Sequence, residues 1–144
     1  MRQVGKQPVH DFVIRSIPHL WEKRGSQCIE INPGSEKNRC AKSMDMYPDV
    51  MGFESAQGQR GLQWVAEVET EDTVTLLKAR THWRQFAALG VPFYVIVPIG
   101  FRDLASLIAQ HEGVPVAGIY HYWFDNRELR LISHEGVGYD THCA

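Results

Sequence analysis

Hydrophobic residues recur at intervals of three and four in three stretches of the chain, and this spacing predicts three amphipathic helices. The stretches cover residues 10–24, 73–89 and 102–111. In the first stretch Val13, Ile14 and Ile17 fall on one face of a helix with 3.6 residues per turn. Gly25 and Gly90 follow the first and second stretches, where glycine is a common helix terminator.

Shorter runs, either alternating or continuously apolar, predict strands. They cover residues 27–31, 47–54, 62–69, 91–97, 116–124 and 128–133. A glycine-containing segment separates the second and third runs, which indicates an antiparallel hairpin. The run at 91–97 is apolar throughout and is typical of a strand buried on both faces at the centre of a sheet. A last hairpin is expected to turn at Asp125 and Asn126, and the chain after Gly136 is expected to be loosely ordered.

The predicted order is therefore helix, three strands, helix, strand, helix and hairpin. Strands and helices that are interleaved in this way favour a central sheet flanked by helices, which is the α/β class. The chain has 144 residues, of which 44% are hydrophobic. This length and composition suit one core, so residues 1–144 are expected to form a single domain.

Charge and composition narrow the function further. The formal net charge is −2, so the chain has no overall positive field with which to hold nucleic acid. Three cysteines at irregular spacing indicate reduced thiols and a cytoplasmic location. The N-terminal residues lack the apolar stretch of a signal peptide, and the longest apolar run, residues 87–99, is too short to cross a bilayer. No membrane association is expected.

Positive charge is concentrated in one polar segment, residues 35–45. Lys37, Arg39 and Lys42 lie there without any apolar period, which predicts an exposed loop. Such a loop can approach a nucleic-acid backbone and supply the local positive charge that the composition lacks. The simpler interpretation is an ordinary solvated loop.

Three acidic residues are expected to come together in the predicted hairpin. Side chains alternate along a strand, so Glu67 and Glu69 project from the same face, and Asp49 lies in the partner strand. Carboxylates held this close repel one another, and a bound Mg²⁺ or Mn²⁺ would offset their charge. The simpler alternative is an acidic, solvated edge of an antiparallel sheet.

At these residues the chain resembles a known superfamily. The sequence Pro48-Asp49, a hairpin turn and then Glu67-Val68-Glu69 is similar to the PD-(D/E)XK motif of the restriction-endonuclease-like nucleases. The predicted element order over residues 9–97 also resembles that superfamily's common core. The resemblance implies an α/β fold with a mixed central sheet, and Mg²⁺- or Mn²⁺-dependent hydrolysis of nucleic acid, with DNA as the expected substrate.

The resemblance also implies roles for individual residues. Asp49 and Glu67 would bind the metal, and the main-chain carbonyl of Val68 would be a further ligand. Glu69 would assist as ligand or base. Glu22, late in the first predicted helix, stands where many members place an additional acid.

The chain departs from the motif at Glu69, where the superfamily usually has lysine. Some restriction enzymes have glutamate there, and other members carry the basic residue on the following helix, where Lys78 is the candidate. Its ammonium group would hold the attacking water or stabilise transition-state charge. His82 and Gln85 follow on the same helical stripe and could face the same groove. A solvent-facing lysine on a polar stripe is an equally good interpretation.

Two alternatives to a nuclease stay open. The first is a nuclease-like domain without activity that serves as a nucleic-acid-binding, regulatory or interaction module, which the glutamate at position 69 and the net acidic charge favour. The second is an unrelated α/β domain with a coincidental acidic edge, in which Asp49 and Glu67 need not meet. A second copy of the chain or another partner chain is compatible with each.

Overall fold

A seven-stranded mixed sheet forms the centre of the structure. The structure is a computed structural model, and it describes residues 6–21, 28–34, 46–54, 61–133 and 139–142. The strands are β1 (Cys28–Ile31), β2 (Val50–Phe53), β3 (Leu62–Val68), β4 (Phe93–Pro98), β5 (Gly118–Asp125), β6 (Glu128–Ser133) and β7 (Tyr139–His142). The helical segments are α1 (Gln7–Trp21), α2 (Leu76–Lys78), η2 (Ala79–Trp83), α3 (Arg84–Ala87) and α4 (Arg102–Glu112). The predicted α/β class is confirmed.

The strands pair in sequence order from β1 to β7. The pairs β3–β4 and β4–β5 are parallel, and all the other pairs are antiparallel. Parallel neighbours need a crossover connection. The helical segments α2 to α3 connect β3 to β4, and α4 connects β4 to β5. β4 is thus the central strand, as its apolar sequence predicts.

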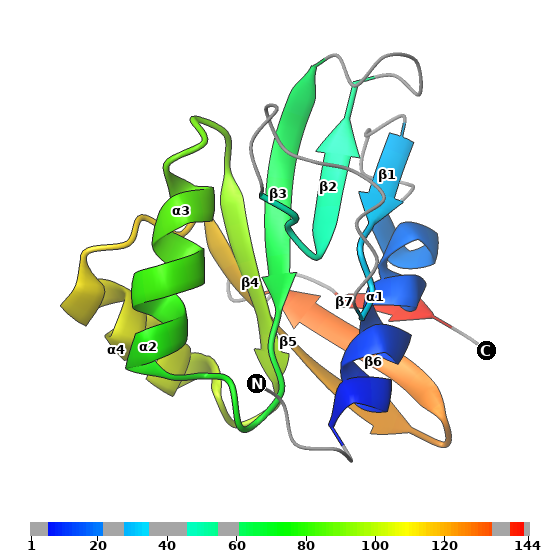
Figure 1. Cartoon of the computed structure of the whole chain (residues 1–144). Helices are drawn as coiled ribbons and strands as arrows, with labels where there is room; N and C mark the ends of the chain where they lie inside the picture. The colour runs from blue at the N-terminus through cyan, green and yellow to red at the C-terminus, as the bar shows by residue number, and fades with distance from the viewer. Residues whose placement is uncertain (1–5, 22–27, 35–45, 55–60, 134–138, 143–144) are drawn as a thin grey trace.

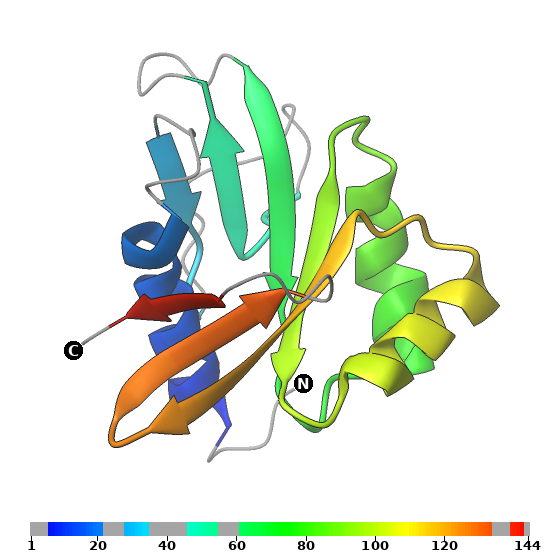
Figure 2. The same cartoon turned by 180° about the vertical axis from the view of Figure 1, so that it is seen from behind.

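Helices cover both faces of the sheet (Figure 1). The segments α2 to α4 pack on one face through a core that includes Trp83 and Val95, and α1 packs on the other through a core that includes Ile14 and Ile96. The sheet curls around α1, so that this helix contacts both β1 and β7 at the two sheet edges. Figure 2 shows β6 and β7 crossing obliquely to β1 and β2.

The chain after Gly136 differs from its prediction. Residues 139–142 form β7 and pair antiparallel with β6, with Leu131 opposite Asp140. The expectation of a loosely ordered tail is wrong there, because backbone pairing with an edge strand requires no apolar pattern. The hairpin before it turns on Asn126 and Arg127, which both have positive φ, as the twist of a two-residue hairpin turn demands.

The helical connection between β3 and β4 also differs from its prediction. A uniform helix is expected over residues 73–89, whereas the helical residues run from Leu76 to Ala87, and the middle five are π-helical. Thr75 caps the start by accepting a hydrogen bond from the Lys78 amide. Within the described part of the chain, no helix is long and apolar enough to span a membrane.

Candidate functional site

Asp49 and Glu67 meet at the start of β2 and the end of β3. Val50 pairs with Ala66, so the next position back along β2 brings Asp49 opposite Glu67. The Asp49 amide donates to Glu67 Oε1 at 2.9 Å. The Val68 amide donates to Asp49 Oδ2 at 2.9 Å. Only 13% of the Asp49 side chain and 3% of the Glu67 side chain are exposed, so the predicted hairpin brings two acids together in a nearly buried position.

Glu69 lies just beyond β3 and is fully buried. The indole Nε1 of Trp83 donates to its Oε2 at 2.7 Å, and the hydroxyl of Thr73 donates to its Oε1 at 2.8 Å. The hydroxyl of Tyr122 donates to its main-chain carbonyl at 2.9 Å. Both carboxylate oxygens of Glu69 therefore already accept hydrogen bonds from the surrounding protein.

Lys78 reaches the same acids from the helical connection. Its Nζ lies 3.4 Å from Glu69 Oε1 and 3.7 Å from Glu67 Oε2, and 16% of its side chain is exposed. The interpretation of Lys78 as a solvated surface residue is therefore wrong. His82 stands at the rim, with Nδ1 3.9 Å from Glu67 Oε2 and about half of its side chain exposed, whereas Gln85 is exposed.

The π-helical turn explains why Lys78 and Trp83 both reach Glu69. In an α-helix two residues five apart point in clearly different directions, because each residue turns the chain by about 100°. The π-helix bonds residues five apart, as in the hydrogen bond from the Arg84 amide to the Ala79 carbonyl. The wider turn brings Lys78 and Trp83 to one side, although the α-helical period assigns them to different faces.

The site holds more negative than positive charge. Burial, and next the charge of Asp49, raise the pKa of Glu67, against the opposing effects of His82 and Lys78. Burial is also the main cause of the raised pKa of Glu69; Lys78 acts against it and the charge of Glu67 adds to it. A single ammonium group thus offsets only part of the cost of burying these carboxylates.

Two carboxylate oxygens of the site accept no hydrogen bond from the residues that the structure describes. One is Asp49 Oδ1, since the hydrogen bonds to this side chain go to Oδ2. The other is Glu67 Oε2, whose neighbours Lys78 and His82 stand 3.7 and 3.9 Å away, beyond hydrogen-bond length. Asp49 is half-buried and Glu67 is buried beside Lys78, and carboxylate oxygens in such positions commonly take a water molecule or an ion as a further partner.

His10 of α1 is a member of this site that the sequence prediction missed. Its Nε2 lies 3.1 Å from Asp49 Oδ2, and its Nδ1 lies 3.1 Å from Asp11 Oδ1. The signal was present in the helical spacing, because position 10 shares the apolar face of Val13, Ile14 and Ile17. A histidine on that face is buried, but its partner 39 positions away could not be named from the sequence.

Four predicted site residues fall on parts of the chain that the structure does not describe. Glu22, Lys37, Arg39 and Lys42 lie outside the described residues. Among the residues that are described, no group of three or more His, Cys, Asp or Glu side chains is arranged to hold a metal ion. Any metal at Asp49 and Glu67 would therefore need ligands beyond these two carboxylates, such as a main-chain carbonyl, water or substrate.

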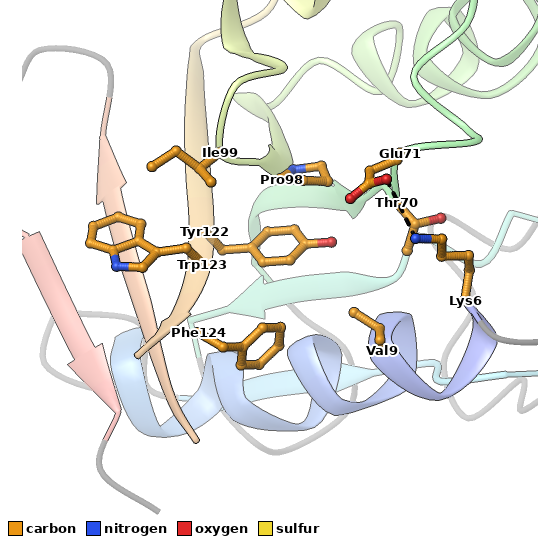
Figure 3. Close-up of a pocket in the computed structure, with 9 residues that line it drawn as sticks. All are labelled: Lys6, Val9, Thr70, Glu71, Pro98, Ile99, Tyr122, Trp123 and Phe124. Carbon is orange, nitrogen blue, oxygen red and sulfur yellow. Dashed lines mark hydrogen bonds and ion pairs between the residues drawn. The ribbon is translucent and has the colours of Figure 1, made fainter. Parts of the chain in front are cut away.

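A pocket of about 260 Å³ lies on the face of the sheet that α1 covers. Its lining consists of Lys6, Val9, Thr70, Glu71, Pro98, Ile99, Tyr122, Trp123 and Phe124. Figure 3 shows the ion pair of Lys6 and Glu71, 3.4 Å long, at one end and Trp123 at the other. Tyr122 connects this pocket to the site, since it lines the pocket and its hydroxyl donates to the main-chain carbonyl of Glu69.

Comparison with known proteins identifies no relative: no family model, no curated protein and no solved structure matches the chain significantly.

Proposed function

We propose that the chain is a metal-dependent phosphodiesterase with a restriction-endonuclease-like fold, which hydrolyses nucleic acid, DNA foremost. The observation that carries this proposal is the meeting of Asp49, Glu67 and Lys78, with two carboxylate oxygens that lack a hydrogen-bond donor from the described residues. The element order and the PD-(D/E)XK-like spacing of the same residues support it from the sequence.

Asp49 and Glu67 suit a hard divalent cation such as Mg²⁺ or Mn²⁺, which prefers oxygen ligands. Asp49 Oδ1 and Glu67 Oε2 are the oxygens assigned to it. The carbonyl of Val68 is the proposed further ligand: its amide donates to Asp49, and the amide and carbonyl of one residue in a strand face the same neighbour. A bound divalent ion supplies an activated water molecule and neutralises charge on the phosphate.

Lys78 is assigned the role of the lysine that the motif lacks at position 69. Its ammonium group is partly exposed beside Glu67, where it can hold a water molecule or stabilise the negative charge of the phosphoryl transition state. Glu69 is assigned the role of holding Lys78 in place, because its two oxygens already accept hydrogen bonds from Trp83 and Thr73. This assignment replaces the role of ligand or base that the sequence suggests for Glu69.

A second candidate is a nuclease-like module that binds nucleic acid or a protein without cleaving it. It is favoured by the contact of Lys78 with both Glu67 and Glu69, because an ammonium group held there serves equally well as a structural counter-ion.

Calorimetric titration with Mn²⁺ tests the metal site. The wild type should bind Mn²⁺, and Asp49→Asn and Glu67→Gln should each weaken binding at least tenfold. Glu71→Gln is the matched control, because Glu71 is an exposed acid two residues beyond Glu69. A wild type without Mn²⁺ binding, or with binding that neither site variant reduces, would refute the proposal.

Cleavage assays then separate the two candidates. The wild type is incubated with Mn²⁺ or Mg²⁺ and with single- and double-stranded DNA and RNA, beside a known nuclease as positive control. Cleavage that is lost in Asp49→Asn and Glu67→Gln supports the phosphodiesterase. Mn²⁺ binding without cleavage of any substrate supports the non-cleaving module. Cleavage that survives in Lys78→Met removes only the role of Lys78.

A further inference from the structure

His10 links α1 to the acidic site through a chain of hydrogen bonds. Its side chain is only 3% exposed, and its two ring nitrogens face two different carboxylates, those of Asp49 and Asp11. Asp11 is itself anchored, since its Oδ1 accepts hydrogen bonds from the Gln7 amide group and from the Gly34 main-chain amide, each at 2.8 Å. The imidazole ring is thus held in one orientation against Asp49.

The direction of the hydrogen bond between His10 and Asp49 follows from the chemistry of its partner. An ionised carboxylate only accepts hydrogen bonds, so the ring nitrogen that faces it must carry the hydrogen. His10 Nε2 is therefore the donor whether Nδ1 accepts from Gln7, 3.3 Å away, or donates to Asp11. Asp49 Oδ2 accordingly accepts two hydrogen bonds, from His10 and from the Val68 amide.

We propose that His10 is a positioning residue for Asp49: together with the Val68 amide it holds Oδ2 and so presents Oδ1 to a divalent cation. The inference rests on the proposed function. Carboxylates that bind metals are commonly held by such outer hydrogen bonds, and loss of one typically weakens metal binding by about 10- to 100-fold. The main chain of Asp49 is already held at its amide by Glu67 Oε1 and at its carbonyl by the Asn32 amide, so the contribution assigned to His10 is the orientation of the carboxylate group.

A buried histidine that only fills space is the ordinary alternative, and three substitutions separate the two. His10→Leu keeps the bulk and removes the donor. His10→Gln keeps an amide nitrogen near the position of Nε2, whereas His10→Asn places its amide nitrogen near the position of Nδ1. His19→Leu, at an exposed position of the same helix, is the control.

Mn²⁺ affinity is measured by calorimetry at one fixed pH, with thermal unfolding recorded for every variant. We expect affinity to fall by about 10- to 100-fold in His10→Leu and His10→Asn, and to stay within about threefold of the wild type in His10→Gln and His19→Leu. If His10→Leu does not fold, the two amide variants decide, because they share polarity and differ in the reach of the donor.

Equal Mn²⁺ affinity of His10→Gln and His10→Asn would overturn the inference, as would affinities in all His10 variants that match the wild type. Loss of folding in both amide variants would also overturn it, since His10 would then serve the fold itself. If the wild type binds Mn²⁺ through Asp49 and Glu67 while the His10 variants bind equally well, only this inference fails. A wild type that binds no Mn²⁺ overturns both proposals.

Discussion

Replacing Lys78 by methionine removes the ammonium group that lies between two buried carboxylates and keeps most of the side-chain volume. The Nζ atom is 3.4 Å from Glu69 Oε1 and 3.7 Å from Glu67 Oε2. Removal of one partner from a buried ion pair usually costs about 3–5 kcal/mol, because the remaining charge is left without compensation. We expect a smaller loss here, since 16% of the Lys78 side chain is exposed and the carboxyl groups can take up a proton.

Proton uptake by one of the two glutamates sets an upper limit on the free energy of unfolding that Lys78→Met can lose. A glutamate has an ordinary pKa of 4.5, so its protonation at pH 7 costs about 3.4 kcal/mol, which is about 2.5 pH units at about 1.36 kcal/mol each. One added proton replaces the lost positive charge, and burial has already raised the pKa of both glutamates. The expected decrease in the free energy of unfolding at pH 7 is therefore about 2–3 kcal/mol.

The loss should shrink as the pH falls. The pKa of a carboxyl group such as Glu67 is raised in the folded state. The stability that this group contributes is fully present below its pKa in the unfolded state, which is 4.5, and is lost as the pH rises from there through its pKa in the folded state. Lys78→Met raises the pKa of Glu67 and Glu69 further, so the difference from the wild type grows with pH. At pH 5 the same limit is only about 0.7 kcal/mol.

Urea denaturation at pH 5 and pH 7, without divalent ions, measures both values. Lys6→Met is the matched control, because Lys6 forms an ion pair with Glu71 at the surface, and such pairs contribute up to about 1 kcal/mol. A loss below about 1 kcal/mol at pH 7, or an equal loss at both pH values, would refute the assignment of Lys78 as counter-ion to buried, ionised carboxylates.

Three further predictions concern neighbouring residues. Glu67→Gln should raise the free energy of unfolding at pH 7 in the absence of metal, because burial penalises the ionised carboxyl group; a destabilised variant in urea denaturation would contradict this. Trp83→Phe removes the donor to the buried Glu69 Oε2 and should cost about 1–3 kcal/mol, whereas an unchanged urea midpoint would argue against this hydrogen bond. Gly52→Ala places a methyl group in overlap with the indole Nε1 of Trp64 and should cost about 1–3 kcal/mol; a melting temperature equal to that of the wild type would show that Trp64 moves aside freely.

The position of the acidic pair was predictable because it depends on local rules. Alternation along a strand puts Glu67 and Glu69 on one face, and antiparallel pairing across a hairpin brings Asp49 opposite Glu67. Continuous apolar character likewise placed β4 at the centre of the sheet. Each of these inferences needs only the period of the side chains and the pairing of neighbouring segments.

The surroundings of the pair were decided by the tertiary structure. A π-helical turn, which the spacing of apolar residues does not encode, changes the direction of Lys78 relative to Trp83 and brings both to Glu69. His10 reaches Asp49 only because α1 packs across the sheet. Which acids meet could therefore be predicted from periods that repeat within a few residues. The partners of those acids depend on the docking of helices, because contacts between distant segments follow no local period.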